Sequence, residues 1–294
     1  ILTWSTGLMF PGKLLAEMAA QKLTGVSANP TAFRLIFDRS SGARPDLSGI
    51  RYVICGGQPF DGALAGDILD FFPKARITSM YGCTENSPRI SHYWLPENPA
   101  SRITPWPVGK PISGTEIKLA DSNGKEVPIG KTGEILVRGA SLMSRYWRAP
   151  DLTESRLVDG WFHTRDSGFI DTDGNLNYAG RLDNVFSVGH EKVSPEEVEA
   201  IIERISDVIE VAVGARRERL RLYVPVALLV TKKGRPFNEI VSDVKKLCKA
   251  SLSAPKVPHE VIPVASIPRT AYGKIDRQGV KALIAGQAHE ARKG

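Results

Sequence analysis

Residues 51–60 have the sequence RYVICGGQPF, in which a short apolar run is followed by two glycines, a glutamine and a proline. Such a run is typical of a buried strand that passes into a tight loop, and the segment that follows has the spacing of a helix. A second strand is expected to end at Tyr81-Gly82. Before both, a helix over residues 12–22 and a strand over residues 23–28 lead to Asn29-Pro30, a helix cap followed by proline. This alternation predicts a mainly parallel sheet with ligands at its strand ends.

The pattern changes at about residue 108. Short extended runs follow, separated by the turn signals Asn123-Gly124 and Asp173-Gly174. Asn-Gly and Asp-Gly pairs between extended runs favour tight hairpins. We therefore predict a small antiparallel β unit after the parallel sheet.

A third pattern begins after Asp183. It predicts a helix that starts at Ser194, two apolar strands between about 208 and 231, and a helix near 238–250. Ser194 and Glu197 have capping-box spacing. The chain is thus expected to be α/β, with part of a large α/β domain and its antiparallel β unit in residues 1–182, and a compact α+β C-terminal domain in residues 183–294.

Composition limits the class of protein. With 42% hydrophobic and 24% charged residues, the 294-residue chain is typical of globular proteins. No apolar run approaches the roughly 20 residues of a membrane span and no secretory signal is present, so we expect a cytoplasmic protein without a membrane segment. The net charge of +7 could suit a nucleic acid, an anionic membrane or a polyphosphate ligand. The basic residues are scattered apart from the cluster at 216–219, which argues against nucleic acid. Cys55, Cys83 and Cys248 are odd in number and widely spaced, which predicts buried thiols.

Residues 79–85, SMYGCTE, directly follow a predicted strand. Tyr81 could stack on a purine, Thr84 could donate to a phosphate oxygen, and Glu85 could hold Mg²⁺ beside that phosphate. The alternative is a simple turn between a strand and a loop.

Two further segments carry polar residues beside predicted strands. In residues 164–166, TRD, Asp166 is expected in a loop next to a strand, where it could accept hydrogen bonds from both ribose hydroxyls. In residues 180–183, GRLD, Arg181 could pair with a phosphate. A surface turn and a solvated ion pair are the competing interpretation.

The remaining two segments differ in what they predict. Residues 133–139, GEILVRG, alternate as a half-buried strand does. In residues 268–277, PRTAYGKIDR, Lys274 follows a glycine and could neutralise phosphate charge. That segment could equally be a loop that enters a helix.

Taken in order, these segments resemble the adenylate-forming enzymes, a superfamily of acyl- and aryl-CoA synthetases, nonribosomal-peptide adenylation domains and luciferases. The resemblance runs from about Thr24 to about Arg277. It implies that Gly56, Gly57 and Tyr81 border the adenine, with Gln58 in the same loop, that Asp166 binds the ribose, and that Arg181 lies near the nucleotide. It implies that Thr84 contacts the α-phosphate, that Glu85 helps to hold magnesium, and that Lys274 acts in adenylation. It also implies that Asp183 is at a hinge between domains and that Gly189 and His190 lie near the thiol donor.

The implied activity uses ATP and Mg²⁺ to convert a carboxylic acid to acyl-AMP, which then passes its acyl group to a thiol. Residues 187–199, SVGHEKVSPEEVE, look more like CoA ligases, so coenzyme A is the expected acceptor. An acyl carrier protein, as in peptide-synthetase adenylation enzymes, is the main alternative. A second alternative is a relative that does not adenylate and only binds an adenylate or completes thioester transfer. A third alternative is a catalytically silent binding module.

Some residues depart from the family pattern. Arg165 stands where glycine is usual, Ser187 where lysine is frequent, and Tyr272 where a smaller polar residue is common. The glycine- and Ser/Thr-rich phosphate loop is missing and is expected upstream of Ile1, so we expect the chain to be the C-terminal part of a longer protein. The acid is not specified, although its pocket should be lined partly by residues 26–28, Cys55 and residues 79–83.

Overall fold

The computed structural model describes residues 10–40, 45–101, 104–189, 191–218, 222–270 and 273–290. It confirms the predicted α/β class. Backbone contacts divide the chain into a first unit, residues 1–164 with 168–178, and a second unit, residues 165–167 with 179–294. The domain boundary that we predict after residue 182 stays a prediction. Among the described residues, none of the helices combines the length and the apolar character that crossing a bilayer requires.

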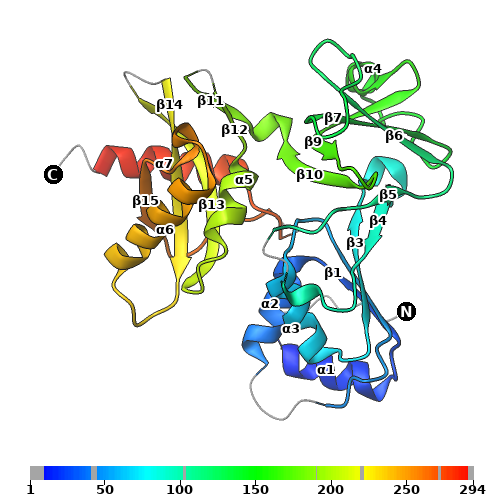
Figure 1. Cartoon of the computed structure of the whole chain (residues 1–294), viewed down its shortest axis with the longest axis horizontal. Helices are drawn as coiled ribbons and strands as arrows, with labels where there is room; N and C mark the ends of the chain where they lie inside the picture. The colour runs from blue at the N-terminus through cyan, green and yellow to red at the C-terminus, as the bar shows by residue number, and fades with distance from the viewer. Residues whose placement is uncertain are drawn as a thin grey trace. The chain divides into compact units, whose positions relative to one another are not determined.

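The first unit contains a five-stranded sheet in the order β1-β2-β3-β4-β5. Figure 1 labels β1, β3, β4 and β5 of this sheet. Its first three strands are parallel, as predicted, and the other two are antiparallel additions. Three helices, α1 to α3, alternate with the first strands. The elements are α1 (Pro11–Ala20), β1 (Gly25–Ala28), α2 (Pro30–Arg39), β2 (Tyr52–Gly56), α3 (Gly62–Phe71), β3 (Arg76–Tyr81), β4 (Ser91–Trp94) and β5 (Lys110–Pro111), with a 3-10 turn η2 (Pro99–Ser101) after β4.

Local sequence explains where these helices begin. The Asn29 side chain accepts a hydrogen bond from the Ala32 amide at 2.7 Å, and Pro30 fills the first helical position of α2, as predicted. Asp61 caps α3 by accepting from the Leu64 amide at 3.3 Å. The helices pack their apolar faces on one core with β2 and β3, whose fully buried members include Phe33, Val53, Cys55 and Ile68.

A second sheet has the order β10-β9-β7-β6, with the short β8 beside β9. The turn glycines Gly124 and Gly174 have φ of +76° and +79°, which glycine adopts readily. The predicted antiparallel unit is therefore formed, although β9 and β10 contribute residues to both units. Its elements are β6 (Thr115–Ala120), β7 (Gly133–Gly139), α4 (Pro150–Arg156), β8 (Leu157–Val158), β9 (Trp161–Ile170) and β10 (Leu176–Arg181).

The second unit is built on the sheet β13-β14-β15, in which β14 is antiparallel to β13 and parallel to β15. A two-stranded ribbon, β11-β12, precedes it. The elements are η3 (Leu182–Asn184), β11 (Phe186–Val188), β12 (Glu191–Val193), α5 (Pro195–Ile202), β13 (Val208–Glu218), β14 (Leu222–Thr231), α6 (Phe237–Ser251), η4 (Ala254–Lys256), β15 (Glu260–Pro263) and α7 (Arg277–Glu290).

Helices cover both faces of this sheet. Val211 and Leu229 pack with α5 and α6, whereas Ala212 and Leu228, one residue away on each strand, pack with α7. Side chains alternate across a strand, so both sets must be apolar when both faces are covered. This explains the nearly continuous apolar runs in β13 and β14.

The predicted capping box at the start of α5 is not formed. The Ser194 hydroxyl donates to the Ala179 carbonyl at 3.1 Å and contacts the Glu196 carboxylate at 2.9 Å, and it makes no capping bond to α5. Glu197 accepts from the Lys256 ammonium at 2.8 Å. Contacts with residues distant in the sequence have replaced the local motif.

Candidate functional site

The carboxyl ends of β1, β2 and β3 lie at one edge of the first unit, because these strands are parallel. Gly56 ends β2 and is paired in register with Met80, which precedes Tyr81 at the end of β3. The predicted glycine loop and the YGxTE segment are therefore neighbours in space.

The glycine loop, residues 56–58, has no side chain at its first two positions, and its third residue is held by a hydrogen bond. Gly57 has φ +85°, and a Cβ on Gly56 would lie 3.0 Å from the Met80 carbonyl oxygen. Gln58 accepts a hydrogen bond from the Thr31 hydroxyl at 2.8 Å, which ties the loop to α2. Larger side chains at the two glycines would close the approach to this edge.

Tyr81 lies largely inside the first unit. Its residue is 7% exposed, and its ring lies 6.1 Å from that of Tyr178, centroid to centroid. Ile90 and Val137 belong to the same apolar cluster. The proposed contact of Tyr81 with a purine therefore stays a prediction and would involve only the exposed part of the residue.

Thr84 and Glu85 lie in the 3-10 turn η1 (Thr84–Asn86), directly beyond β3. Thr84 is exposed and Glu85 is half-buried. The Tyr146 hydroxyl donates to Glu85 Oε1 at 2.7 Å, and the Met143 amide donates to the Glu85 carbonyl at 2.7 Å. Tyr146 is thus a site residue that sequence reasoning did not assign, although its segment followed a recognised motif.

The Glu85–Tyr146 pair has a defined protonation state. Burial raises the pKa of Glu85, but hydrogen bonds, chiefly from Tyr146, outweigh it and leave the pKa below its usual value. Burial and then the hydrogen bond to Glu85 raise the pKa of Tyr146 to about 12. At neutral pH the pair is therefore a carboxylate beside a phenol.

A carboxylate of this kind fits magnesium. Mg²⁺ is commonly held by one or two carboxylates together with substrate phosphates, so Glu85 alone could provide the protein ligand. Within the part of the chain that the structure describes, no group of three or more His, Cys, Asp or Glu side chains is arranged to hold a metal.

The chain folds back tightly after Tyr81. A Cβ at Gly82 would overlap the Pro88 carbonyl, so only glycine fits where the two backbones approach each other. Ser87, at φ +50°, makes the reversal. This fold keeps residues 82–90 close to the end of β3.

In the second unit, Asp166 and Arg181 come from neighbouring strands, β9 and β10. Asp166 is 7% exposed, and its Oδ1 lies 3.6 Å from Arg181 Nη1. Arg181 also lies 3.6 Å from Asp183, whose carboxylate accepts from Arg165 Nε at 3.3 Å. The two predicted site residues are therefore brought together in one chain of charges.

Arg165 has φ +61°, in the left-handed region that favours glycine. This backbone conformation explains why glycine is usual at this position, and arginine occupies it here at the cost of strain. Its side chain is exposed and forms an ion pair with Asp183.

Lys274 lies on a loop closed by an antiparallel bridge between Arg269 and Ile275. The Thr270 amide donates to the Lys274 carbonyl at 2.8 Å, and Gly273 turns the chain at φ +77°. Lys274 is exposed, as is Gly189 at φ +59°. The predictions that concern His190 and Tyr272 lie outside the described residues.

A further charged cluster was not predicted. Arg277, at the start of α7, donates to the buried Glu199 at 2.9 Å and to Glu196 at 3.1 Å. Asn184, next to the predicted hinge residue, donates to Glu196 at 2.6 Å. Arg277 is the last residue of the GKIDR motif, but the sequence did not indicate its partners because they are distant along the chain.

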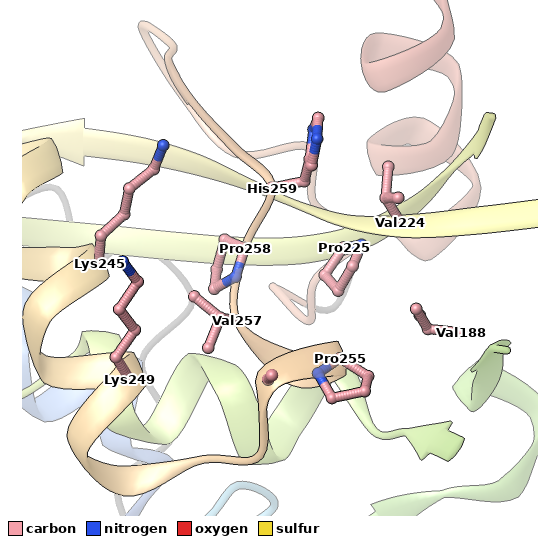
Figure 2. Close-up of a pocket in the computed structure, with 10 residues that line it drawn as sticks. Val188, Val224, Pro225, Lys245, Lys249, Pro255, Val257, Pro258 and His259 are labelled. Atoms are coloured by element: carbon pink, nitrogen blue, oxygen red, sulfur yellow. The ribbon is translucent and has the colours of Figure 1, made fainter. Parts of the chain in front are cut away.

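The second unit also contains a cavity of about 300 Å³. Figure 2 shows Lys245 and Lys249 on one side of it and Val188 on the other, with Val257 and three proline residues between them. His259 also lines the cavity. Val188 directly precedes Gly189, so the cavity lies beside the segment expected near the thiol donor.

Comparisons with known proteins match both units. A model described as AMP-binding enzyme matches residues 2–147, and one described as AMP-binding enzyme C-terminal domain matches residues 197–274. A probable CoA ligase from Humulus lupulus is 30% identical over 94% of this chain and 52% of its own length. An oxalate–CoA ligase from Arabidopsis thaliana is 32% identical over 89% of the chain and 50% of its own length.

A solved structure of an anthranilate CoA ligase in complex with anthranoyl-AMP has a TM-score of 0.82 at 28% identity. The match covers 94% of this chain and 52% of the anthranilate CoA ligase chain. The chain thus spans about half the length of the relatives that it matches.

Proposed function

Because the chain belongs to the family of AMP-binding enzymes, we propose that it is the adenylate-binding part of an AMP-forming acid–thiol ligase. The observation that carries this proposal is the assembly at one sheet edge of residues 56–58, Tyr81, Thr84 and Glu85. Open glycine backbone, a hydroxyl and a fixed carboxylate are the groups that an adenylate and its phosphate require.

In the proposed reaction, a carboxylate oxygen of the acid attacks the α-phosphorus of ATP, and pyrophosphate leaves. A thiolate then attacks the acyl carbon, and AMP leaves. Thr84 would donate to the α-phosphate, and Lys274 would offset the anionic charge in the first step. Glu85 would hold Mg²⁺, which lowers the repulsion between the two anions.

For the nucleoside, we propose that the two oxygens of Asp166 accept hydrogen bonds from the ribose hydroxyls. Arg181 Nη1 lies 3.6 Å from Asp166 Oδ1, where its positive charge would help to orient this carboxylate. Gly56, Gly57 and Gln58 would border the adenine. These roles rest on the resemblance, together with the position of Gly56 at the end of β2 and that of Asp166 beside Arg181.

We propose coenzyme A as the thiol. The cavity beside Val188 carries Lys245 and Lys249, whose ammonium groups suit the phosphates of this molecule. The relatives are named mostly as CoA ligases, although one from Streptomyces coeruleorubidus is named a fatty acid–[acyl-carrier-protein] ligase. Reduced thiols at all three cysteines are consistent with the cytoplasmic location that we propose.

The experiment that tests this function is calorimetry of AMP binding to residues 1–294. Asp166→Ala should weaken binding by about 1–3 kcal/mol, because the ribose hydroxyls lose a charged acceptor. Asp173→Ala is a matched control, since it removes an exposed carboxylate from the turn between the same two strands. Equal affinities for all three proteins would show that Asp166 is a structural partner of Arg181 and nothing more.

A further inference from the structure

One arginine is held beside the candidate site by the loop that follows β3. The Asn86 side chain donates to the Arg89 carbonyl at 3.1 Å, and the Ile90 amide donates to the Tyr81 carbonyl at 2.9 Å. Asn86 is fully buried, so it anchors the loop from inside the unit. Arg89 therefore has a defined position next to the end of β3.

The side chain of Arg89 lies against Met80. Its Nε donates to the Met80 sulfur at 3.3 Å, a weak bond that still orients the guanidinium plane. The Met80 methyl faces the glycine loop, because a Cβ on Gly56 would lie 3.2 Å from it. A single thioether thus separates the guanidinium from the loop that we assign to the adenylate.

Arg89 differs from Arg181 and Arg277 in the groups that its side chain contacts. Arg181 and Arg277 are paired with carboxylates. Among the residues that the structure describes, no Asp or Glu oxygen lies within 4.0 Å of the Arg89 guanidinium. Its two Nη groups form a planar fork that matches a carboxylate in bidentate geometry.

We propose that Arg89 recognises a second carboxylate on the acid that this site activates, so that the substrate is a dicarboxylic acid. The inference rests on the proposed function and specifies its substrate. Residues 79–83 are expected to line part of the acyl pocket, and Met80 brings Arg89 to that stretch. One carboxylate would attack the α-phosphorus with loss of pyrophosphate, while the other would stay ionised against Arg89.

The test measures how residues 1–294 bind non-hydrolysable acyl-sulfamoyl-adenosines by calorimetry. Each analogue with a distal carboxylate is paired with one that carries a methyl group instead: succinyl with butyryl, glutaryl with pentanoyl, adipoyl with hexanoyl, and meta-carboxybenzoyl with meta-methylbenzoyl. We expect at least one diacid analogue to bind about 10- to 100-fold more tightly than its partner, as one charge-assisted contact provides.

Two variants identify the group responsible. Arg89→Ala should reduce the diacid preference to about one. Arg76→Ala removes the same charge from the opposite end of β3, where Arg76 lies over the Trp94 ring, and should keep the preference. Ratios near one for all four pairs, or a preference that survives Arg89→Ala, would overturn the inference while the function stands. If neither AMP nor any analogue binds, the proposed function fails and the inference fails with it.

Discussion

Arg165 shows how a single residue can conflict with its backbone. At φ +61° a side chain with a Cβ is strained by roughly 1 kcal/mol or more, whereas glycine is not. The exposed ion pair with Asp183 offsets little of this strain energy, because solvent screens such pairs.

We predict that Arg165→Gly is more stable than Arg165→Ala by about 1 kcal/mol, since both variants lose the ion pair and only glycine relieves the strain. The measurement is urea denaturation of both variants followed by fluorescence. Equal midpoints would mean that the backbone at residue 165 relaxes once the arginine is removed.

The cysteines differ in burial, which the sequence only partly indicated. Cys55 and Cys248 are fully buried as predicted, but Cys83 is half-buried beside Glu85. Burial raises the pKa of Cys248 to about 11, and burial also raises the pKa of Cys55. At pH 8 only about one in a thousand Cys248 side chains is a thiolate.

One thiol should therefore react quickly with Ellman's reagent in the native protein at pH 8. Cys83→Ser should abolish this fast phase, and the other two thiols should react only after denaturation. Three equally fast thiols at pH 8 would contradict the burial of Cys55 and Cys248.

At the scale of elements, local signals predicted the structure where the partners are local. The Asn29 cap of α2 involves residues three apart, and it formed as expected. The Ser194–Glu197 box did not form, because the Ala179 carbonyl and Lys256 provide other partners. The same limit applies to the site. The end of β3 located Tyr81, but Asp166, which we expected in a loop beside a strand, lies within β9, and no sequence spacing connects Glu85 with Tyr146.

Arg277 joins α7 to α5 and β13 through such distant contacts. It pairs with the buried Glu199, which also accepts from the Val213 amide at 2.7 Å. Arg277→Ala should destabilise the second unit by about 3–5 kcal/mol, because it leaves a buried carboxylate without its cation. Thermal and urea denaturation would measure the loss.

Arg235 provides the matched control, since it also pairs with carboxylates, in its case three more exposed ones, Asp207, Glu239 and Asp243. Arg235→Ala should destabilise the unit much less than Arg277→Ala. If the two variants lose the same stability, burial of Glu199 is not what makes the Arg277 cluster important.

At the scale of the whole molecule, the two units carry different groups. The first unit holds the glycine loop, Thr84 and Glu85, and the second holds Asp166, Gly189 and Lys274. The 294 residues include no glycine- and Ser/Thr-rich loop followed by lysine, which in the family grips the β- and γ-phosphates. An adenylate has neither of these phosphates, whereas ATP has both.

We therefore predict that residues 1–294 bind an acyl-sulfamoyl-adenosine but exchange labelled pyrophosphate into ATP at less than about one hundredth of the rate of a full-length relative. Removing even one stabilising group from a transition state commonly costs a hundredfold, and here a whole phosphate-binding loop is missing. The oxalate–CoA ligase from Arabidopsis thaliana, which is 32% identical, would serve as the positive control. Rapid exchange by residues 1–294 would require a β,γ-phosphate site within this chain, and the exposed Lys274 would then be the first residue to replace, because it already lies on a glycine loop with its ammonium group in solvent.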